Sequence, residues 1–252
     1  MYRYKLTIEY HGGYFCGWQR QKDVKSVQQT IEEALYQLMQ KGDDFPILHC
    51  AGRTDTGVHA YGQVAHTDIS RNMEDYKLLK ALNYYLKDER VKVIACENLG
   101  LAEQTDFHAR FSCTARAYQY RIVNRLSPLA IEFGLAWQVD YDLDAQKMHQ
   151  AGQYLIGRHD FSSFRAAGCQ ASSALRSIDE LNIQRKDDEV IINIKAISFL
   201  YHQVRNIVGS LVLVGQGKWS EQDFKAVLEA KDRTQAGPTA PAEGLYFMGA
   251  YY

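Results

Sequence analysis

Apolar and polar residues alternate at the start of the chain, a pattern typical of a β-strand with one buried face. Within residues 2–10, Tyr4, Leu6, Ile8 and Tyr10 fall on one face, and polar residues separate them. The pattern predicts a strand over this segment.

The next periodic segment has the spacing of a helix. Ser26 is followed three residues later by Gln29, which is a capping-box pattern. Beyond it, apolar residues recur along a single helical stripe, namely Val27, Ile31, Ala34, Leu35 and Leu38. We therefore expect a helix beginning at Ser26.

Strands and helices alternate along the rest of the chain. Strands are predicted at residues 63–68, 91–97, 114–123, 178–185, 189–196 and 245–251, and helices at 76–86, 144–155, 202–214 and from Ser220. The segments mix without an obvious repeat, which favours the α+β class with a mixed or antiparallel sheet. The most plausible crossing between domains lies at residues 100–112, and we divide the chain into 1–105 and 106–252.

Composition limits the classes of protein. With 46% hydrophobic and 23% charged residues, the chain resembles an ordinary globular protein. It has no apolar run of signal-peptide or membrane-spanning length, and its 5 cysteines form no close pair, so we expect a cytoplasmic protein with reduced thiols. The formal net charge of −1 gives no global electrostatic indication of a nucleic-acid partner.

Candidate chemistry is concentrated in residues 51–66, AGRTDTGVHAYGQVAH. The triplet Asp-Thr-Gly carries the catalytic carboxylate of aspartic proteases, but those enzymes need a pair of such loops and this chain has one. A plain turn is the structural alternative, because Gly52, Asp55 and Gly57 are common turn formers.

The context of this triplet resembles a known family. GRTDTGVHA is similar to the signature loop of the tRNA pseudouridine synthase A (TruA) family. Further blocks resemble that family in the same order, namely FCGWQ (15–19), FHARF (107–111), RAYQY (116–120), HDFSSF (159–164), FLYHQVRNIVG (199–209) and APAEGL (240–245). Gln203, where methionine is usual, and Leu86–Arg90, which lacks an expected proline, depart from the pattern without touching the chemistry.

The resemblance implies a fold and a reaction. It implies two ferredoxin-like or RRM-like subdomains with mainly antiparallel sheets, helices on one side and a central cleft. The N-terminal subdomain would carry the aspartate loop, and the C-terminal one would carry a tyrosine and an arginine of the active site. The implied activity is isomerisation of uridine to pseudouridine in the anticodon stem-loop of tRNA by a homodimer, without a cofactor.

Asp55 and Arg205 are the predicted catalytic residues. The resemblance assigns Asp55 the catalytic role and leaves open whether it attacks the uracil ring or the ribose. A carboxylate beside a base in a partly dry site requires a cationic partner to stay ionised. Arg205 is our candidate, since it lies among apolar helix positions and within a matching block.

Substrate contacts are predicted for an aromatic residue and several arginines. A uridine taken out of a stem needs an aromatic platform, and the resemblance assigns this role to Tyr118. Arg53, Arg110 and Arg116 lie in matching blocks and are candidate phosphate contacts. Other arginines are more typical of solvated surface, namely Arg121, Arg158, Arg165 and Arg176.

The remaining candidates have no strong chemical signal. His59 is either structural or RNA-facing, and no cysteine or carboxylate is spaced with His59 and His66 as a metal ligand would be. Cys16 is expected to pack rather than to act as a nucleophile. A catalytically inactive RNA-binding module remains the alternative function, and the intact Arg53, Asp55 and Arg205 argue against it.

Overall fold

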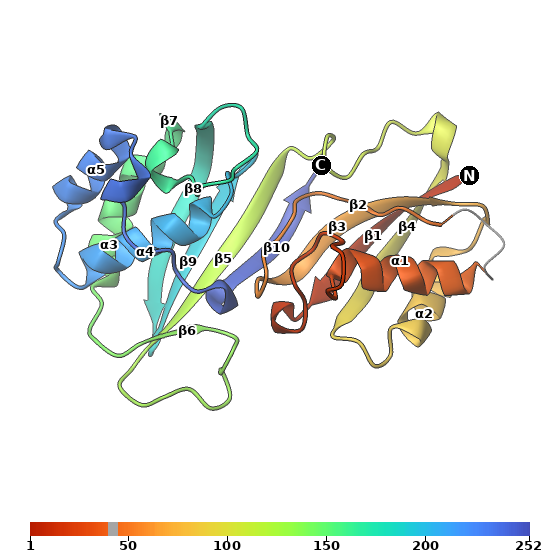
Figure 1. Ribbon diagram of the computed structural model, residues 1–252, viewed down its shortest axis with the longest axis horizontal. Coiled ribbons are helices and arrows are strands. Elements are labelled where there is room, and N and C mark those ends of the chain that lie inside the picture. Colours follow the sequence, from red (N-terminus) through yellow and green to blue (C-terminus); the bar gives the residue numbers. More distant parts are fainter. Residues whose placement is uncertain (40–44) are drawn as a thin grey trace. The chain divides into compact units, whose positions relative to one another are not determined.

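The computed structural model describes residues 1–39 and 45–252, and the chain divides into two compact units (Figure 1). Unit 1 comprises Met1–Thr114 together with Phe247–Tyr252, and unit 2 comprises Ala115–Tyr246. The chain therefore passes between the units at two places.

Unit 1 is built on an antiparallel sheet. Its strands are β1 (Tyr2–Tyr10), β2 (His49–Cys50), β3 (His59–Ile69) and β4 (Val91–Leu101). Their order is β4–β1–β3, and β2 pairs with the other side of β3. Tyr4, Leu6 and Ile8 are fully buried, which confirms the face predicted from the alternation in β1.

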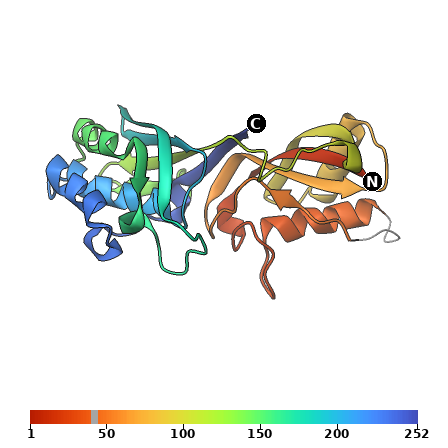
Figure 2. The ribbon, with the colours of Figure 1, turned by 90° about the horizontal axis from the view of Figure 1, so that it is seen from above.

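The helices of unit 1 are α1 (Val27–Leu38) and α2 (Asp75–Tyr85). The Ser26 hydroxyl accepts a hydrogen bond from the Gln29 N–H at 3.3 Å, so the predicted N-cap forms. The two helices pack against each other, and Figure 2 shows α1 running along one face of the sheet.

The strands of unit 2 are also mainly antiparallel. Its strands are β5 (Ala115–Asn124), β6 (Trp137–Val139), β7 (Gly157–Asp160), β8 (Leu175–Lys186) and β9 (Glu189–Ala196). Their order is β5–β9–β8–β7, and β6 pairs with β5 in the parallel direction. In the turn between β8 and β9, Asp187 lies in the left-handed region at φ 54°.

Three helices belong to unit 2, namely α3 (Ala145–Gly152), α4 (Gln203–Gly215) and α5 (Glu221–Ala230). They pack against one another, and α3 also packs against β8. Ser220 and Asp223 form a capping box at the start of α5. Within the described residues the fold is α+β with a mixed sheet and 5 helices, which confirms the predicted class.

The last strand, β10 (Leu245–Tyr251), links the units. It begins in unit 2, and from Phe247 onward it belongs to unit 1, where it neighbours β3. The sequence analysis divided the chain between residues 105 and 106, whereas the first unit continues to Thr114. The division also placed the last residues, Phe247–Tyr252, in the C-terminal part, whereas they belong to unit 1. Among the helices described, none is long and apolar enough to cross a membrane.

Candidate active site

Asp55 lies in a tight turn between β2 and β3. The Asp55 carbonyl accepts a hydrogen bond from the Val58 N–H at 3.1 Å, and Gly57 has a φ of 83°. This is the arrangement of a type II turn, which needs glycine at its third position. The turn that the glycine spacing predicted therefore forms, and it fixes the backbone of the candidate catalytic residue.

Tyr10, at the end of β1, and the segment that follows it form hydrogen bonds to this turn. The Trp18 N–H donates to the Thr54 carbonyl at 3.0 Å, and the hydroxyls of Tyr10 and Thr54 are hydrogen-bonded at 2.7 Å. Gly17 has a φ of 84°, and a Cβ at this position would lie 2.8 Å from the Thr54 carbonyl oxygen. The close approach explains why the FCGWQ block needs a glycine.

Successive residues of the loop differ in exposure. Arg53 is exposed, Thr54 is buried and Asp55 is half-buried. The buried Gln63 side chain donates to the Gly52 carbonyl at 2.7 Å and anchors the start of the loop. The loop thus presents a carboxylate that remains partly accessible on a backbone held by buried hydrogen bonds.

His59 is buried at the beginning of β3. Its Nδ1 atom accepts a hydrogen bond from the Gly12 N–H at 3.0 Å, and its ring lies 4.7 Å from that of His11. Only 2% of His59 is exposed. Of the two roles considered for His59, these contacts favour the structural one.

Tyr118 and Arg116 share the buried face of β5 in unit 2. The Tyr118 ring meets the Phe199 ring edge-on, with centroids 5.2 Å apart. Arg116 is buried, and its guanidinium donates to the Ile197 carbonyl. The predicted common face is therefore present, but Arg116 is less accessible than a typical phosphate-binding arginine.

Arg205 is half-buried in the first turn of α4, between buried helix positions. Its Nε–H donates to the Ala240 carbonyl at 2.7 Å, and its own carbonyl accepts from the Ala240 N–H at 3.1 Å. Nearby, the Tyr120 hydroxyl donates to the Pro241 carbonyl at 2.7 Å. The matching blocks around Arg205 and Ala240 are thus in direct contact within unit 2.

Of the other arginines, Arg158 is exposed as predicted, whereas Arg121, Arg165 and Arg176 are half-buried, which corrects the prediction that they are solvated surface residues. Arg121 forms an ion pair with Glu132 at 3.0 Å, and Arg165 donates to the Cys169 carbonyl at 2.9 Å. Arg53 and Arg110, by contrast, are exposed in unit 1. No group of three or more His, Cys, Asp or Glu side chains in the described part of the chain could hold a metal ion.

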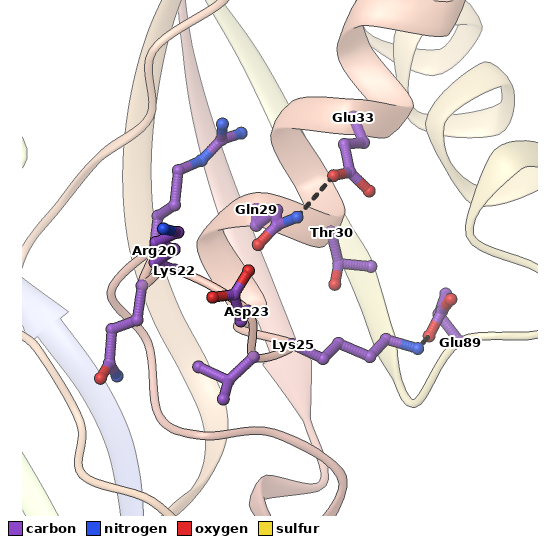
Figure 3. Close-up of a pocket in the computed structure, with 10 residues that line it drawn as sticks. Arg20, Lys22, Asp23, Lys25, Gln29, Thr30, Glu33 and Glu89 are labelled. Carbon is purple, nitrogen blue, oxygen red and sulfur yellow. Dashed lines mark hydrogen bonds and ion pairs between the residues drawn. The ribbon is translucent and has the colours of Figure 1, made fainter.

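A cavity of about 590 Å³ lies beside the start of α1 (Figure 3). Some of the charged side chains that line it form ion pairs. Lys25 pairs with Glu89, and Arg20 pairs with the buried Glu32 at 2.8 Å. None of the predicted site residues lines it. We therefore assign this cavity no part in the chemistry.

Some features of unit 1 were not predicted. The sequence did not single out Thr54 and Tyr10 as supports of the aspartate turn, nor a series of contacting rings that ends at Phe111. The available signal for the rings was the FHARF block, in which aromatic residues flank a histidine and an arginine.

Comparison with known proteins places these features in a family. The family model described as tRNA pseudouridine synthase matches residues 6–112 and 151–252, and the strand that carries Tyr118 lies between these segments. The chain is 51% identical over 252 residues to the tRNA pseudouridine synthase A of Rhodospirillum centenum, with 100% of both chains covered. It is 48% identical to the tRNA pseudouridine synthase A of Maricaulis maris, with 100% of this chain and 98% of the relative covered. It is also 48% identical to the enzyme of that name from Rhodospirillum rubrum, with 98% of this chain and 87% of the relative covered. The chain belongs to the tRNA pseudouridine synthase A family, as its motifs indicated.

Proposed function

We propose that Asp55 is the catalytic carboxylate with which this tRNA pseudouridine synthase converts uridine to pseudouridine. The enzyme is an isomerase, so neither a protease nor an inactive RNA-binding module describes it. The observation that supports Asp55 is its half-buried position on a turn held by buried hydrogen bonds from Tyr10 and Trp18. A fixed carboxylate can attack a substrate without first being ordered.

The reaction needs no redox partner. It breaks the glycosidic C–N bond, rotates the uracil and joins a ring carbon to the ribose, with release of the proton from uracil C5. A nucleophile and a pocket that retains the detached base are sufficient for this chemistry. We therefore propose no cofactor.

Arg205 is the proposed counter-charge for Asp55. A guanidinium stays protonated at all relevant pH values and favours the ionised form of a neighbouring carboxylate. Arg205 is half-buried, and its hydrogen bond to the Ala240 carbonyl holds part of the guanidinium in place. This restraint supports a fixed electrostatic role rather than that of an exposed helical arginine.

Tyr118 is the proposed platform for the flipped uracil. Its ring is held by the edge-on contact with Phe199, which reduces the entropy lost when a base stacks on it.

Arg53 and Arg110 are exposed and are the proposed contacts to RNA phosphates, whereas the buried Arg116 is a weaker candidate. His59 would act indirectly, by supporting the loop. The proposed target is the anticodon stem-loop of tRNA, and a tRNA substrate fits a cytoplasmic enzyme.

The chemical proposal is tested with unmodified tRNA that carries tritium at uracil C5. We expect the wild-type protein to release tritium and mapping to place pseudouridine in the anticodon stem-loop. Asp55→Ala should abolish release and still bind tRNA, and Arg205→Met should lower turnover sharply with little effect on stability. Near-normal turnover in Arg205→Met would remove the proposed pairing, and pseudouridine confined to another region of the tRNA would overturn the proposed target.

A homodimer is proposed from the loop that precedes β6. This loop extends away from the neighbouring strands (Figure 1), and it exposes Leu126 by 83%, Ile131 by 88% and Phe133 by 80%. Its charged residues are engaged within unit 2, since Arg125 pairs with Asp188 at 3.1 Å and Glu132 pairs with Arg121. An apolar loop with engaged charges fits a permanent interface between copies better than an RNA surface.

Light scattering on purified protein tests the dimer. We expect the wild-type chain to be dimeric and Ile131→Glu to shift it toward monomer. Ile47→Glu is the matched control, because Ile47 is also exposed, by 61%, and lies in unit 1. A monomeric wild type, or an Ile131→Glu protein as dimeric as the control, would contradict the proposal.

A further inference from the structure

The side chain of Arg233 joins the segment that follows α5 to helix α4. Its Nη1 atom donates to the Gly237 carbonyl at 3.0 Å and to the Ala236 carbonyl at 3.4 Å. Its Nη2 atom donates to Oδ1 of Asn206 at 3.2 Å and to the Thr239 hydroxyl at 3.1 Å. Asn206 belongs to α4, so one guanidinium contacts the segment and the helix at the same time.

Residues 236–240, which we call the 236–240 segment, lie directly against α4. The Thr239 hydroxyl donates to Oδ1 of Asn206 at 2.6 Å. A Cβ at Gly209 would lie 1.7 Å from the Pro238 carbonyl oxygen, so the main chains of the segment and the helix are in contact. The position of the segment is therefore set by its contacts with the helix.

The 236–240 segment ends at the hydrogen-bond partner of Arg205. Ala240 is buried, and its carbonyl accepts the 2.7 Å hydrogen bond from the Arg205 Nε–H. The orientation of the Arg205 guanidinium thus depends on where this carbonyl lies. A residue that holds the segment in place also holds the proposed counter-charge in place.

Arg233 is suited to hold the segment. Asn206 is fully buried, and its amide needs partners at both ends: its Nδ2 donates to the Phe164 carbonyl at 2.9 Å, and its Oδ1 accepts from Arg233. The backbone beside Arg233 is anchored as well, since the Asp232 N–H donates to the Ser163 hydroxyl at 2.9 Å. Both terminal nitrogens of Arg233 bind protein oxygens, so this side chain is poorly placed to bind an RNA phosphate.

We propose that Arg233 is a positioning residue for pseudouridine formation, which orients the Arg205 guanidinium by holding the 236–240 segment against α4. This inference rests on the proposed function in taking Arg205 as the counter-charge of the catalytic carboxylate. Arg233 acts through the Ala240 carbonyl and not through contact with the substrate. A small displacement of a charged group in an active site is enough to lower the rate strongly.

Turnover of full-length variants tests the effect on the reaction. Arg233→Lys keeps the charge, but an ammonium group lacks the planar fork that reaches the segment and Asn206 together. We expect kcat to fall at least about tenfold, with KM and tRNA affinity within about twofold of wild type. The assay is run well below the melting temperature of each variant, so that unfolding does not contribute.

Arg185→Gln is the matched control. Arg185 also belongs to unit 2, and its guanidinium likewise donates to an asparagine oxygen and a carbonyl, those of Asn124 and Leu143, both at 2.7 Å. These contacts do not involve the 236–240 segment. We therefore expect Arg185→Gln to keep the kcat of the wild type.

The Thr239 hydroxyl tests the same link without a change at Arg233. Thr239→Val removes the hydroxyl that joins the segment to Asn206, and we expect kcat to fall about threefold to tenfold. Thr239→Ser keeps the hydroxyl and should stay within about twofold of wild type. Equal activity of the two variants would show that this hydroxyl does not hold the segment.

Nuclear magnetic resonance of the Arg205 side chain measures the positioning without the reaction. The Nε–H signal is assigned by its absence in Arg205→Met. In the wild type its hydrogen bond to the Ala240 carbonyl should slow exchange with water, and Arg233→Lys should shift the signal and speed exchange at least about tenfold. Arg185→Gln should leave the signal unchanged.

Three results would overturn the positioning role. These are an unchanged Arg205 signal in Arg233→Lys, a kcat of Arg233→Lys near that of wild type when Arg205→Met has lost turnover, or a raised KM with unchanged kcat, which would make Arg233 an RNA contact. Arg205→Met keeps the two proposals apart. If it retains turnover while Arg233→Lys alters the Arg205 signal, the proposed counter-charge fails and the link between Arg233 and Arg205 stands.

Discussion

Replacing Gly17 with alanine should disturb the aspartate turn through the backbone alone. Gly17 has a φ of 84°, and its added Cβ would lie 2.8 Å from the Thr54 carbonyl oxygen and 3.2 Å from the Asp55 carbonyl carbon. These are main-chain atoms, so they cannot move aside without moving the turn that carries Asp55. The new methyl group therefore acts on the position of the proposed catalytic residue.

The magnitude follows from two costs. The left-handed backbone costs an L-residue about 1–2 kcal/mol, and a forced contact in a packed region costs about 1–3 kcal/mol more. We expect Gly17→Ala to lower the free energy of unfolding by about 2–4 kcal/mol after the smaller entropy of unfolded alanine is allowed for. Because a small misplacement of a catalytic group can cost orders of magnitude in rate, kcat should fall at least about tenfold.

Gly100→Ala is the matched control. Gly100 has a φ of 88°, and a Cβ there would meet nothing within 4 Å. Gly100→Ala therefore carries the cost of the left-handed backbone without a forced contact. We expect it to lower the free energy of unfolding by about 1 kcal/mol and to leave kcat unchanged. Urea denaturation and tritium release measure both effects. Equal destabilisation by the two substitutions, with normal turnover in Gly17→Ala, would refute the proposed support of the aspartate turn by this segment.

Two further predictions concern buried polar groups of unit 1. Tyr10→Phe should cost about 1–3 kcal/mol, because it leaves the buried Thr54 hydroxyl without its 2.7 Å partner. Adding Thr54→Val should recover part of that loss in urea denaturation, and no recovery would show that the hydroxyl pair is not the cause. Burial lowers the folded-state pKa of His66 from 6.5 to about 4, so the unfolded chain takes up a proton first as the pH falls, and stability should drop by about 2 kcal/mol between pH 7 and pH 5. His66→Gln should flatten this dependence, and an unchanged pH profile in that variant would assign it to other groups.

The long periodic elements could be predicted from the sequence. The alternation in β1 and the Ser26 cap of α1 carry local signals that the fold retains, because the same residues that set the pattern are buried or capped. The short strands β6 and β7 were missed, since three or four residues carry no period and their pairing with β5 and β8 determines them.

Parts of the candidate site could also be predicted, and for a different reason. The glycine and aspartate of the Asp55 turn are signals of local backbone chemistry, so the turn was visible in the sequence. The contacts of Tyr10 with Thr54 and of His49 with His66 join residues distant in sequence. Only the tertiary fold brings such residues together, through the register of β2 and β3 in the case of the two histidines, and a single sequence does not contain it.

The measurement that tests the central claim most directly is a single-turnover assay of Asp55→Asn with C5-tritiated tRNA. Asparagine keeps the size and shape of the side chain and removes its charge and nucleophilicity. We predict tRNA affinity within about threefold of wild type and no detectable tritium release, since a nucleophile is absent. Tritium release by Asp55→Asn at a rate near that of the wild type would show that the carboxylate at position 55 does not carry the reaction.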